Sequence, residues 1–219
     1  DYSYFKGIYL FPVEFIENAI FSLIYFTGNF KMDNLKIVSG GAFYYSNFSG
    51  SLSLPLCEQI GAYAFVSSNF SGSLNLPVCE QIGDGAFESS NFSGLLSLPV
   101  CVEVGDLAFI YSNFSGSLNL PVCEQIRNHA FQDSLFNGEV NLPACTSIGD
   151  YAFISSNFSG ELSLPVCTYI GGYTFENSNF NKITIGANAV LGEYCIGAHS
   201  TEFIADYAAN GKLAGTYVW

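Results

Sequence analysis

A spacing of 22 residues recurs along almost the whole chain. Prolines keep this spacing at Pro55, Pro77, Pro99, Pro121, Pro143 and Pro165. Cysteines keep it at Cys57, Cys79, Cys101, Cys123, Cys145 and Cys167. Two phenylalanine columns keep it at Phe43, Phe65, Phe87, Phe109, Phe131, Phe153, Phe175 and at Phe48, Phe70, Phe92, Phe114, Phe136, Phe158, Phe180. Because several residue types agree on one period, we predict a solenoid in which each repeat forms one coil.

The repeat extends toward both ends of the chain. Pro12 and Ile16 fit the template with one deletion, and Gly186 and Ile196 match later columns. We therefore expect about eight repeats over residues 1–196, the first one partial, and a C-terminal cap over residues 197–219. No polar cap is visible at Asp1, so we expect further chain or a partner at that end.

One repeat unit, residues 69–90, predicts the course of a coil. Ser73–Leu76 alternates polar and apolar residues and ends at a proline, which is typical of a half-buried strand. Gly72 is expected at positive φ before this strand, and Gly83 in a tight turn after it. Gly85–Phe87 is predicted to form a short helical or 3₁₀ turn. The remaining inward positions are predicted at Val78, Cys79 and Ile82.

These residues resemble a known family. The repeat length lies in the leucine-rich-repeat range, and Leu74-x-Leu76-x-x-Cys79 fits part of that motif. The blocks LNLPVCEQIGDGAF and FSGSLNLP resemble the BspA-like leucine-rich repeats of bacterial and protist surface proteins, and the ending FIADYAANGKLAGTYVW is similar to non-repeat endings in some of them. The resemblance implies a β-rich, right-handed leucine-rich-repeat superhelix, with a parallel β-sheet on one face and short turns or 3₁₀ segments on the other. One departure is a shorter step from the proline to the cysteine.

The seven cysteines favour a packing role. Side chains that recur at one position point the same way in successive coils, which opposes the dihedral angle of a disulfide. A spacing of 22 residues is also unlike the close pairs of zinc sites. We therefore prefer a column of small apolar thiols in the core over disulfide bridges. Cys195 lies outside this column and receives no role.

Acidic residues also form columns. Asp84, Asp106 and Asp150 share one position, and Glu58, Glu80 and Glu124 share another. We interpret both as solvated edges, with a calcium site as the less favoured alternative. No cofactor is expected. With two histidines and no catalytic motif, the chain is expected not to be an enzyme.

The outward residues of the predicted strands form a candidate binding face. They are small and polar for the most part: Ser73, Asn75, Leu95, Ser97, Ser117, Asn119, Glu139, Asn141, Glu161 and Ser163, with Ser51 and Ser53 preceding them. Such a face is either generically solvated or used for recognition. Arg127, the only arginine, replaces the turn glycine of its repeat, and His129 follows it. This exception is either drift or a point of specificity.

Charge limits the partners. The net charge is −13, which disfavours nucleic acid and anionic lipid. The longest apolar stretch, residues 19–26, is too short to span a bilayer, so no membrane insertion is expected. The resemblance implies an extracellular or cell-surface module for recognition or adhesion, with a protein ligand or a host or cell-surface partner. The alternative is a structural subunit that self-associates end to end. A flat lattice that matches ice or another surface is disfavoured, because the face lacks regular threonines.

The sequence Asn-Phe-Ser forms glycosylation sequons at Asn47, Asn69, Asn91, Asn113 and Asn157. Two repeats lose the sequon but keep their phenylalanines, Phe136 and Phe180. The repeat therefore preserves the phenylalanine rather than the sequon. We interpret the motif as a corner of the coil, in which asparagine and serine bond along a ladder, and expect little or no glycan.

Overall fold

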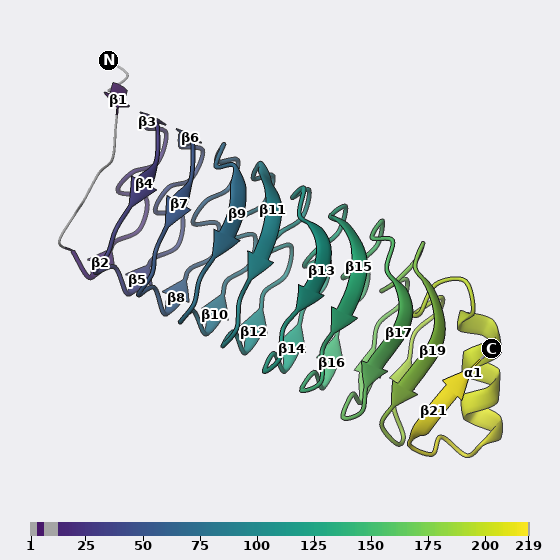
Figure 1. Cartoon of the computed structure of the whole chain (residues 1–219). Helices are drawn as coiled ribbons and strands as arrows, with labels where there is room; N and C mark the ends of the chain where they lie inside the picture. Colours follow the sequence, from purple (N-terminus) through teal and green to yellow (C-terminus); the bar gives the residue numbers. More distant parts are fainter. Residues whose placement is uncertain (1–3, 7–12, 219) are drawn as a thin grey trace.

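The computed structural model describes residues 4–6 and 13–218, and for residues 4–6, 25 and 26 it describes the backbone alone. Pro12 and Asp1 lie outside the described residues. The chain forms a β-solenoid whose coils stack in one row, from the N-terminal coils to a helix at the C-terminal end (Figure 1). This confirms the predicted solenoid with a parallel sheet.

Strands that lengthen from two residues near the N-terminus to as many as seven line one side of the solenoid, which we call the wide face. They are β4 (Phe30–Lys31), β7 (Leu52–Ser53), β9 (Gly72–Asn75), β11 (Phe92–Ser97), β13 (Ser115–Asn119), β15 (Leu135–Asn141), β17 (Ser159–Leu164) and β19 (Asn179–Ile185). Near the N-terminus, a separate parallel sheet contains β1 (Tyr4–Lys6), β3 (Tyr25–Thr27) and β6 (Asn47–Ser49). Pairing along the wide face is interrupted, because β4–β7, β9–β11 and β13–β15–β17–β19 belong to different sheets.

A second parallel sheet was not anticipated from the sequence. Its nine strands have two residues each, and in most of them the second residue is a buried isoleucine or valine. They are β2 (Phe15–Ile16), β5 (Ile37–Val38), β8 (Gln59–Ile60), β10 (Gln81–Ile82), β12 (Glu103–Val104), β14 (Gln125–Ile126), β16 (Ser147–Ile148), β18 (Tyr169–Ile170) and β20 (Val190–Leu191). A two-residue strand is too short for a periodic pattern to reveal it.

The third side of each coil consists of turns. In residues 85–90, N–H groups donate alternately to the next coil and within their own coil. Ala86 N–H donates to the Gly83 oxygen (3.2 Å), whereas Phe87 N–H donates to the Ala108 oxygen (2.8 Å). Gly85 and Ser89 have φ of 58° and 57°. The predicted 3₁₀ alternative is therefore wrong: these are successive turns, and the described residues contain no 3₁₀ helix.

Stacked phenylalanines fill the core. Phe87 and Phe109 lie parallel with their ring centroids 5.2 Å apart, and the second column stacks likewise, with Phe92 and Phe114 at 5.7 Å. The two columns meet edge to face, as between Phe109 and Phe114 at 77°. Both arrangements are favourable for aromatic quadrupoles. The 22-residue period thus becomes a continuous herringbone of buried rings.

The cysteine column lies in the core as predicted. All seven thiols are buried and free. Each column thiol also donates a hydrogen bond to the carbonyl oxygen two residues later, for example from Cys101 Sγ to Glu103 (3.3 Å). The inward position predicted at Val78 is wrong. Val78 is half-buried at a corner of the coil, and its counterparts Val100 and Val166 are exposed.

Glycines serve two different purposes in the coil. Gly72 has φ of 80°, as predicted, but its counterpart Gly94 in the next coil does not have positive φ. Gly83 does not have positive φ either; a Cβ atom there would lie 2.6 Å from the Ala62 nitrogen of the preceding coil. Gly83 is therefore required for the close approach of two coils.

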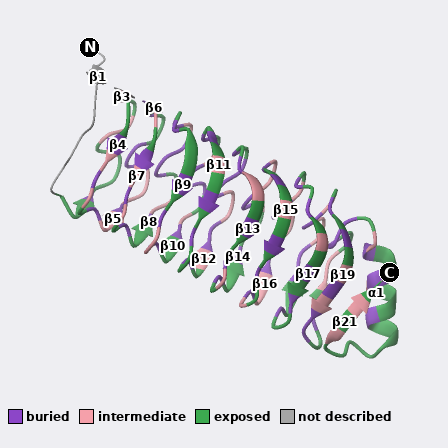
Figure 2. Cartoon of the chain, viewed as in Figure 1, coloured by how far each residue is buried: buried purple, intermediate pink, exposed green. Residues whose placement is uncertain are grey.

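The C-terminal residues cover the last coil. Helix α1 (Ser200–Ala209) places Phe203 and Tyr207 against the core, while the rest of its surface is mostly exposed (Figure 2). Tyr207 OH donates to the Gly186 oxygen (2.7 Å) and accepts from Ala189 N–H (2.8 Å). Strand β21 (Gly215–Val218) pairs antiparallel with β19. The boundary between the solenoid and the C-terminal cap at residue 197 is a proposal. No helix of the described residues is long and apolar enough to cross a membrane.

Candidate recognition surface

The structure brings ten of the twelve predicted site residues onto the wide face. Two come from each strand from β9 to β17, and all ten are exposed: Ser73, Asn75, Leu95, Ser97, Ser117, Asn119, Glu139, Asn141, Glu161 and Ser163. Their outward orientation follows from the strand period of two, which buries Leu74 and Leu118 between them. Arg127 and His129 do not join this group, because they follow β14 on another side of the coil.

Some of the polar side chains on this face hold neighbouring coils together. The hydroxyl oxygens of Ser73 and Ser117 accept the backbone N–H groups of Leu95 (3.0 Å) and Glu139 (3.1 Å). Asn141 Nδ2 donates to Asn119 Oδ1 (2.7 Å). These hydrogen bonds fix the side chains in position, so the face is ordered before any ligand arrives.

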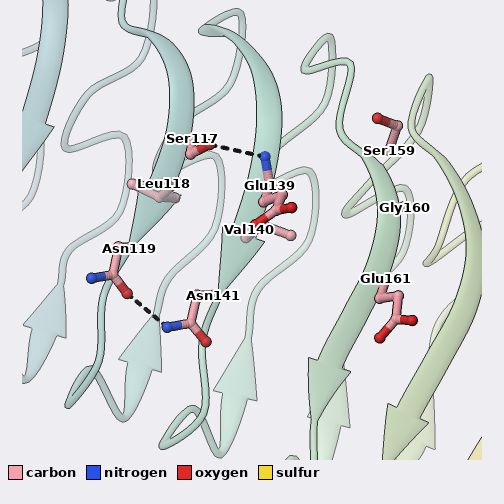
Figure 3. A pocket seen from close by; sticks show the side chains of 9 residues that line it. All are labelled: Ser117, Leu118, Asn119, Glu139, Val140, Asn141, Ser159, Gly160 and Glu161. Atoms are coloured by element: carbon pink, nitrogen blue, oxygen red, sulfur yellow. Dashed lines mark hydrogen bonds between the residues drawn. The ribbon is translucent and has the colours of Figure 1, made fainter.

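A hollow of about 710 Å³ interrupts the wide face between β13 and β17. Its lining contains five predicted residues together with residues that sequence reasoning missed: Ser117, Leu118, Asn119, Glu139, Val140, Asn141, Ser159, Gly160 and Glu161 (Figure 3). At the hollow, β15 and β17 pair only at Asn141 and Ser163, whereas β17 and β19 pair along six positions. No sequence signal distinguishes Gly160 from Gly116, since both follow the same period.

Charge at the hollow is negative. Glu139 on β15 and Glu161 on β17 lie on its two sides (Figure 3). Glu161 Oε1 forms an ion pair with Lys182 Nζ at 2.8 Å. Glu139 forms no ion pair with any residue that the structure describes. The other polar groups are amides and hydroxyls. This donor and acceptor set suits hydrogen bonding to a polar or basic ligand rather than acyl or phosphoryl transfer.

Arg127 acts between coils. Its Nε and Nη2 atoms both lie 2.5 Å from Glu103 Oε1, and the hydrogen bond to this carboxylate raises the pKa of Arg127. His129 Nδ1 lies 2.6 Å from Gln132 Oε1, and its ring stacks on Tyr151. Both residues therefore have intramolecular partners on a surface distinct from the wide face.

The aspartate column also forms a hydrogen-bond ladder, which its interpretation as a solvated edge did not include. Asp84 Oδ1 accepts Asp106 N–H (2.9 Å), and Asp106 Oδ1 accepts Asn128 N–H (2.8 Å). The ladder continues from Asn128 to Asp150 and from Asp150 to Gly172. Asparagine fits the column because it offers the same acceptor. In the described part of the chain, no group of three or more His, Cys, Asp or Glu side chains could hold a metal ion.

The repeat matches a known family model. Six copies of the BspA type leucine-rich-repeat region cover residues 14–136 and 80–201. The chain belongs to the BspA-type leucine-rich-repeat family. Solenoids of the BspA type are typically protein-interaction scaffolds without enzymatic activity, and the family is generally associated with surface or secreted proteins. Searches of curated proteins and of solved structures gave no match.

Proposed function

We propose that the chain is a secreted or cell-surface, non-enzymatic module that recognises a protein partner through the hollow on its wide face, in a role such as adhesion. The single observation that carries this proposal is the hollow itself. It opens on the wide face, and hydrogen bonds between coils hold the side chains around it. A solenoid presents such a face to its ligands without rearrangement.

The charge of the module selects the partner. Glu139 and Glu161 flank the hollow, and the whole chain carries a net charge of −13. An extended protein segment with lysine or arginine side chains fits this potential, because complementary charge raises the rate of association and fixes register. A nucleic acid or an acidic protein would be repelled.

A matched pair of charge reversals tests the site. The partner is first captured with the intact chain from surface extracts of the source cells, and its dissociation constant is then measured for both variants. Glu139→Lys should weaken binding about tenfold or more, because it reverses the charge at the hollow. Glu80→Lys changes the net charge equally at an exposed position directly before β10, away from the wide face, and should leave the affinity within about twofold.

Equal weakening by the two variants would show that only net charge matters and would refute the assignment of the hollow. Location is tested separately by protease treatment of intact cells. A surface module is cleaved under conditions that spare an intracellular marker, and complete resistance of a chain that is cleaved after lysis would contradict surface exposure.

End-to-end assembly is the weaker alternative. It requires that both ends of the solenoid can accept another copy. The C-terminal coil is covered by α1, and β21 occupies the edge of β19. We therefore do not pursue this alternative.

A further inference from the structure

One position of the turn side forms a column in which every residue has φ between 51° and 63°. We call it the ring column. It consists of Ala19, Gly41, Tyr63, Gly85, Leu107, His129, Tyr151, Tyr173 and Tyr194. The strained backbone is the same whether the residue is glycine, leucine or tyrosine. This shows that the coil geometry, and not the side chain, sets the conformation.

Toward the C-terminus the ring column is a continuous stack. His129 and Tyr151 lie with centroids 5.0 Å apart, and Tyr151 and Tyr173 with centroids 5.3 Å apart at 3°. Tyr194 continues the stack at 5.3 Å. Within this stack, from His129 to Tyr194, the neighbour of each ring is another ring one coil away.

Toward the N-terminus Tyr63 is the one ring of this column, because Ala19, Gly41, Gly85 and Leu107 carry none. Gly41 stands one coil before Tyr63, where Tyr151 stands before Tyr173. The Tyr63 ring lies over Gly85 on its other side, since a Cβ atom on Gly85 would be 2.6 Å from ring carbons. Tyr63 is 45% exposed. Its face toward Gly41 therefore has no ring of this column against it.

A hollow of about 590 Å³ lies at this position and is lined by Ala19, Ser22, Gly40, Gly41, Tyr44, Ala62 and Tyr63. A Cβ atom on Gly41 would meet only Tyr44 Cβ, at 3.9 Å. The hollow is therefore wide enough at its base to accept a group in the missing position. We call this hollow the ring slot.

The walls of the ring slot specify the chemistry of its ligand. Among its described lining residues, the polar side-chain atoms are the hydroxyls of Ser22, Tyr44 and Tyr63. A sugar ring would meet only these three hydroxyls as side-chain hydrogen-bond partners, whereas an aromatic ring needs none of them and stacks on Tyr63. The net charge of −13 disfavours an anionic ligand, and desolvation, Tyr45 and the carboxylate of Glu88 raise the pKa of Tyr44 in the same sense. An aromatic ring without negative charge satisfies both conditions.

We propose that the ring slot binds the aromatic side chain of a protein partner, which stacks on Tyr63 in place of the missing ring at Gly41. The proposal rests on the proposed function only for the source of the ring, because the slot lies on the turn side and not on the wide face. Binding of the ring itself is tested without any partner, so that failure of one proposal is distinguishable from failure of the other.

The experiment titrates the intact chain with N-acetyl-L-tyrosinamide and follows saturation transfer from protein to ligand by NMR. Because a single ring is buried, we expect a dissociation constant on the order of 1 mM. The anionic analogue 3-(4-hydroxyphenyl)propionate should bind several-fold more weakly, and methyl β-D-glucopyranoside should show no transfer. Glu139→Lys should bind the tyrosinamide like the unmodified chain.

Each variant introduces a residue type that already occurs at another position of the ring column. Gly41→Tyr supplies the missing ring at a φ that Tyr63, Tyr151 and Tyr173 already adopt, and should abolish binding. Tyr63→Leu removes the stacking ring, with Leu107 as its natural precedent, and should weaken binding about fivefold or more. Leu107→Tyr adds a ring to the same column outside the slot and should leave binding unchanged. Thermal unfolding verifies that each variant is folded.

The proposal is overturned if the tyrosinamide shows no transfer at 10 times the expected dissociation constant, roughly 10 mM. It is also overturned if the glucoside competes with the tyrosinamide, or if folded Tyr63→Leu binds as well as the unmodified chain. Should Gly41→Tyr fail to fold, the Tyr63→Leu and Leu107→Tyr pair decides the matter alone.

Discussion

Alkaline pH should destabilise the chain through its buried thiols. Burial raises the pKa of Cys101 from 9.0 to about 12, and the pKa of Cys57 to about 11. In the unfolded chain these thiols ionise near pH 9, whereas in the folded chain they stay protonated. Protons are thus bound more tightly by the folded state, and the stabilisation present below pH 9 is lost as the pH rises toward 12.

A single cysteine suffices to measure this effect. For Cys101, ionisation in the unfolded state alone lowers the free energy of unfolding by about 1.4 kcal/mol at pH 10, and by less than about 0.1 kcal/mol at pH 8. Cys101→Ala cannot ionise, so its destabilisation relative to the parent chain should be about 1.4 kcal/mol smaller at pH 10 than at pH 8. Tyrosine ionisation is common to both chains and cancels in this comparison.

The assay is urea unfolding of both chains at the two pH values under reducing conditions. Cys101→Ser is the matched control, because its hydroxyl can keep the hydrogen bond to the Glu103 oxygen and yet does not titrate in this range. It should show the same pH difference as the alanine variant, whatever its own stability at pH 8. If both variants are destabilised equally at pH 8 and at pH 10, burial does not raise the pKa of Cys101 in the folded chain.

Three further predictions concern the ladders and the core. Asp106→Ala should lower the free energy of unfolding by about 1–2 kcal/mol, because it removes the acceptor of Asn128 N–H, whereas Asp106→Asn should stay within about 0.5 kcal/mol of the parent chain. Urea unfolding measures both variants, and equal stability of the two would leave only the solvated-edge interpretation. Phe109→Ala should lower the free energy of unfolding by about 3–5 kcal/mol, because it leaves a cavity where the two phenylalanine columns meet. Thermal unfolding measures this loss, and a loss below about 1 kcal/mol would contradict the continuous core. Asn91 should carry little or no glycan, since its Nδ2 donates to Asn69 Oδ1 (2.6 Å); hexosamine in the intact mass of the secreted chain would prove this wrong.

Much of the coil was predictable from one repeat. The alternation in Ser73–Leu76 identified the inward leucines, and the stop at the proline identified the end of the strand. The phenylalanines and cysteines were placed correctly because identical side chains at a fixed period must occupy the same layer of every coil. The turn at Gly85–Phe87 was only partly predicted, because its N–H groups alternate between partners near in sequence and partners in the next coil.

The sequence predicted which residues of the candidate site face outward, but not where along the wide face the hollow lies. The period of two along the strands put Ser117, Asn119 and Glu139 outward, and the structure agrees. Yet the same pattern occurs in every repeat, and it gives no reason for a hollow between β13 and β17. The loss of pairing upstream of Asn141 depends on how two adjacent coils fit, which a one-coil pattern does not contain.

The sequence by itself determined the period, the buried columns and the membership of the repeat family, because these properties belong to each coil separately. The tertiary structure decided what arises between coils. It shows that Asp106 Oδ1 accepts the N–H group of Asn128 in the next coil, and that the ringless Gly41 lies beside Tyr63 in one hollow. Both depend on contacts between residues 22 positions apart, and such contacts exist only after the chain has stacked one coil on the next.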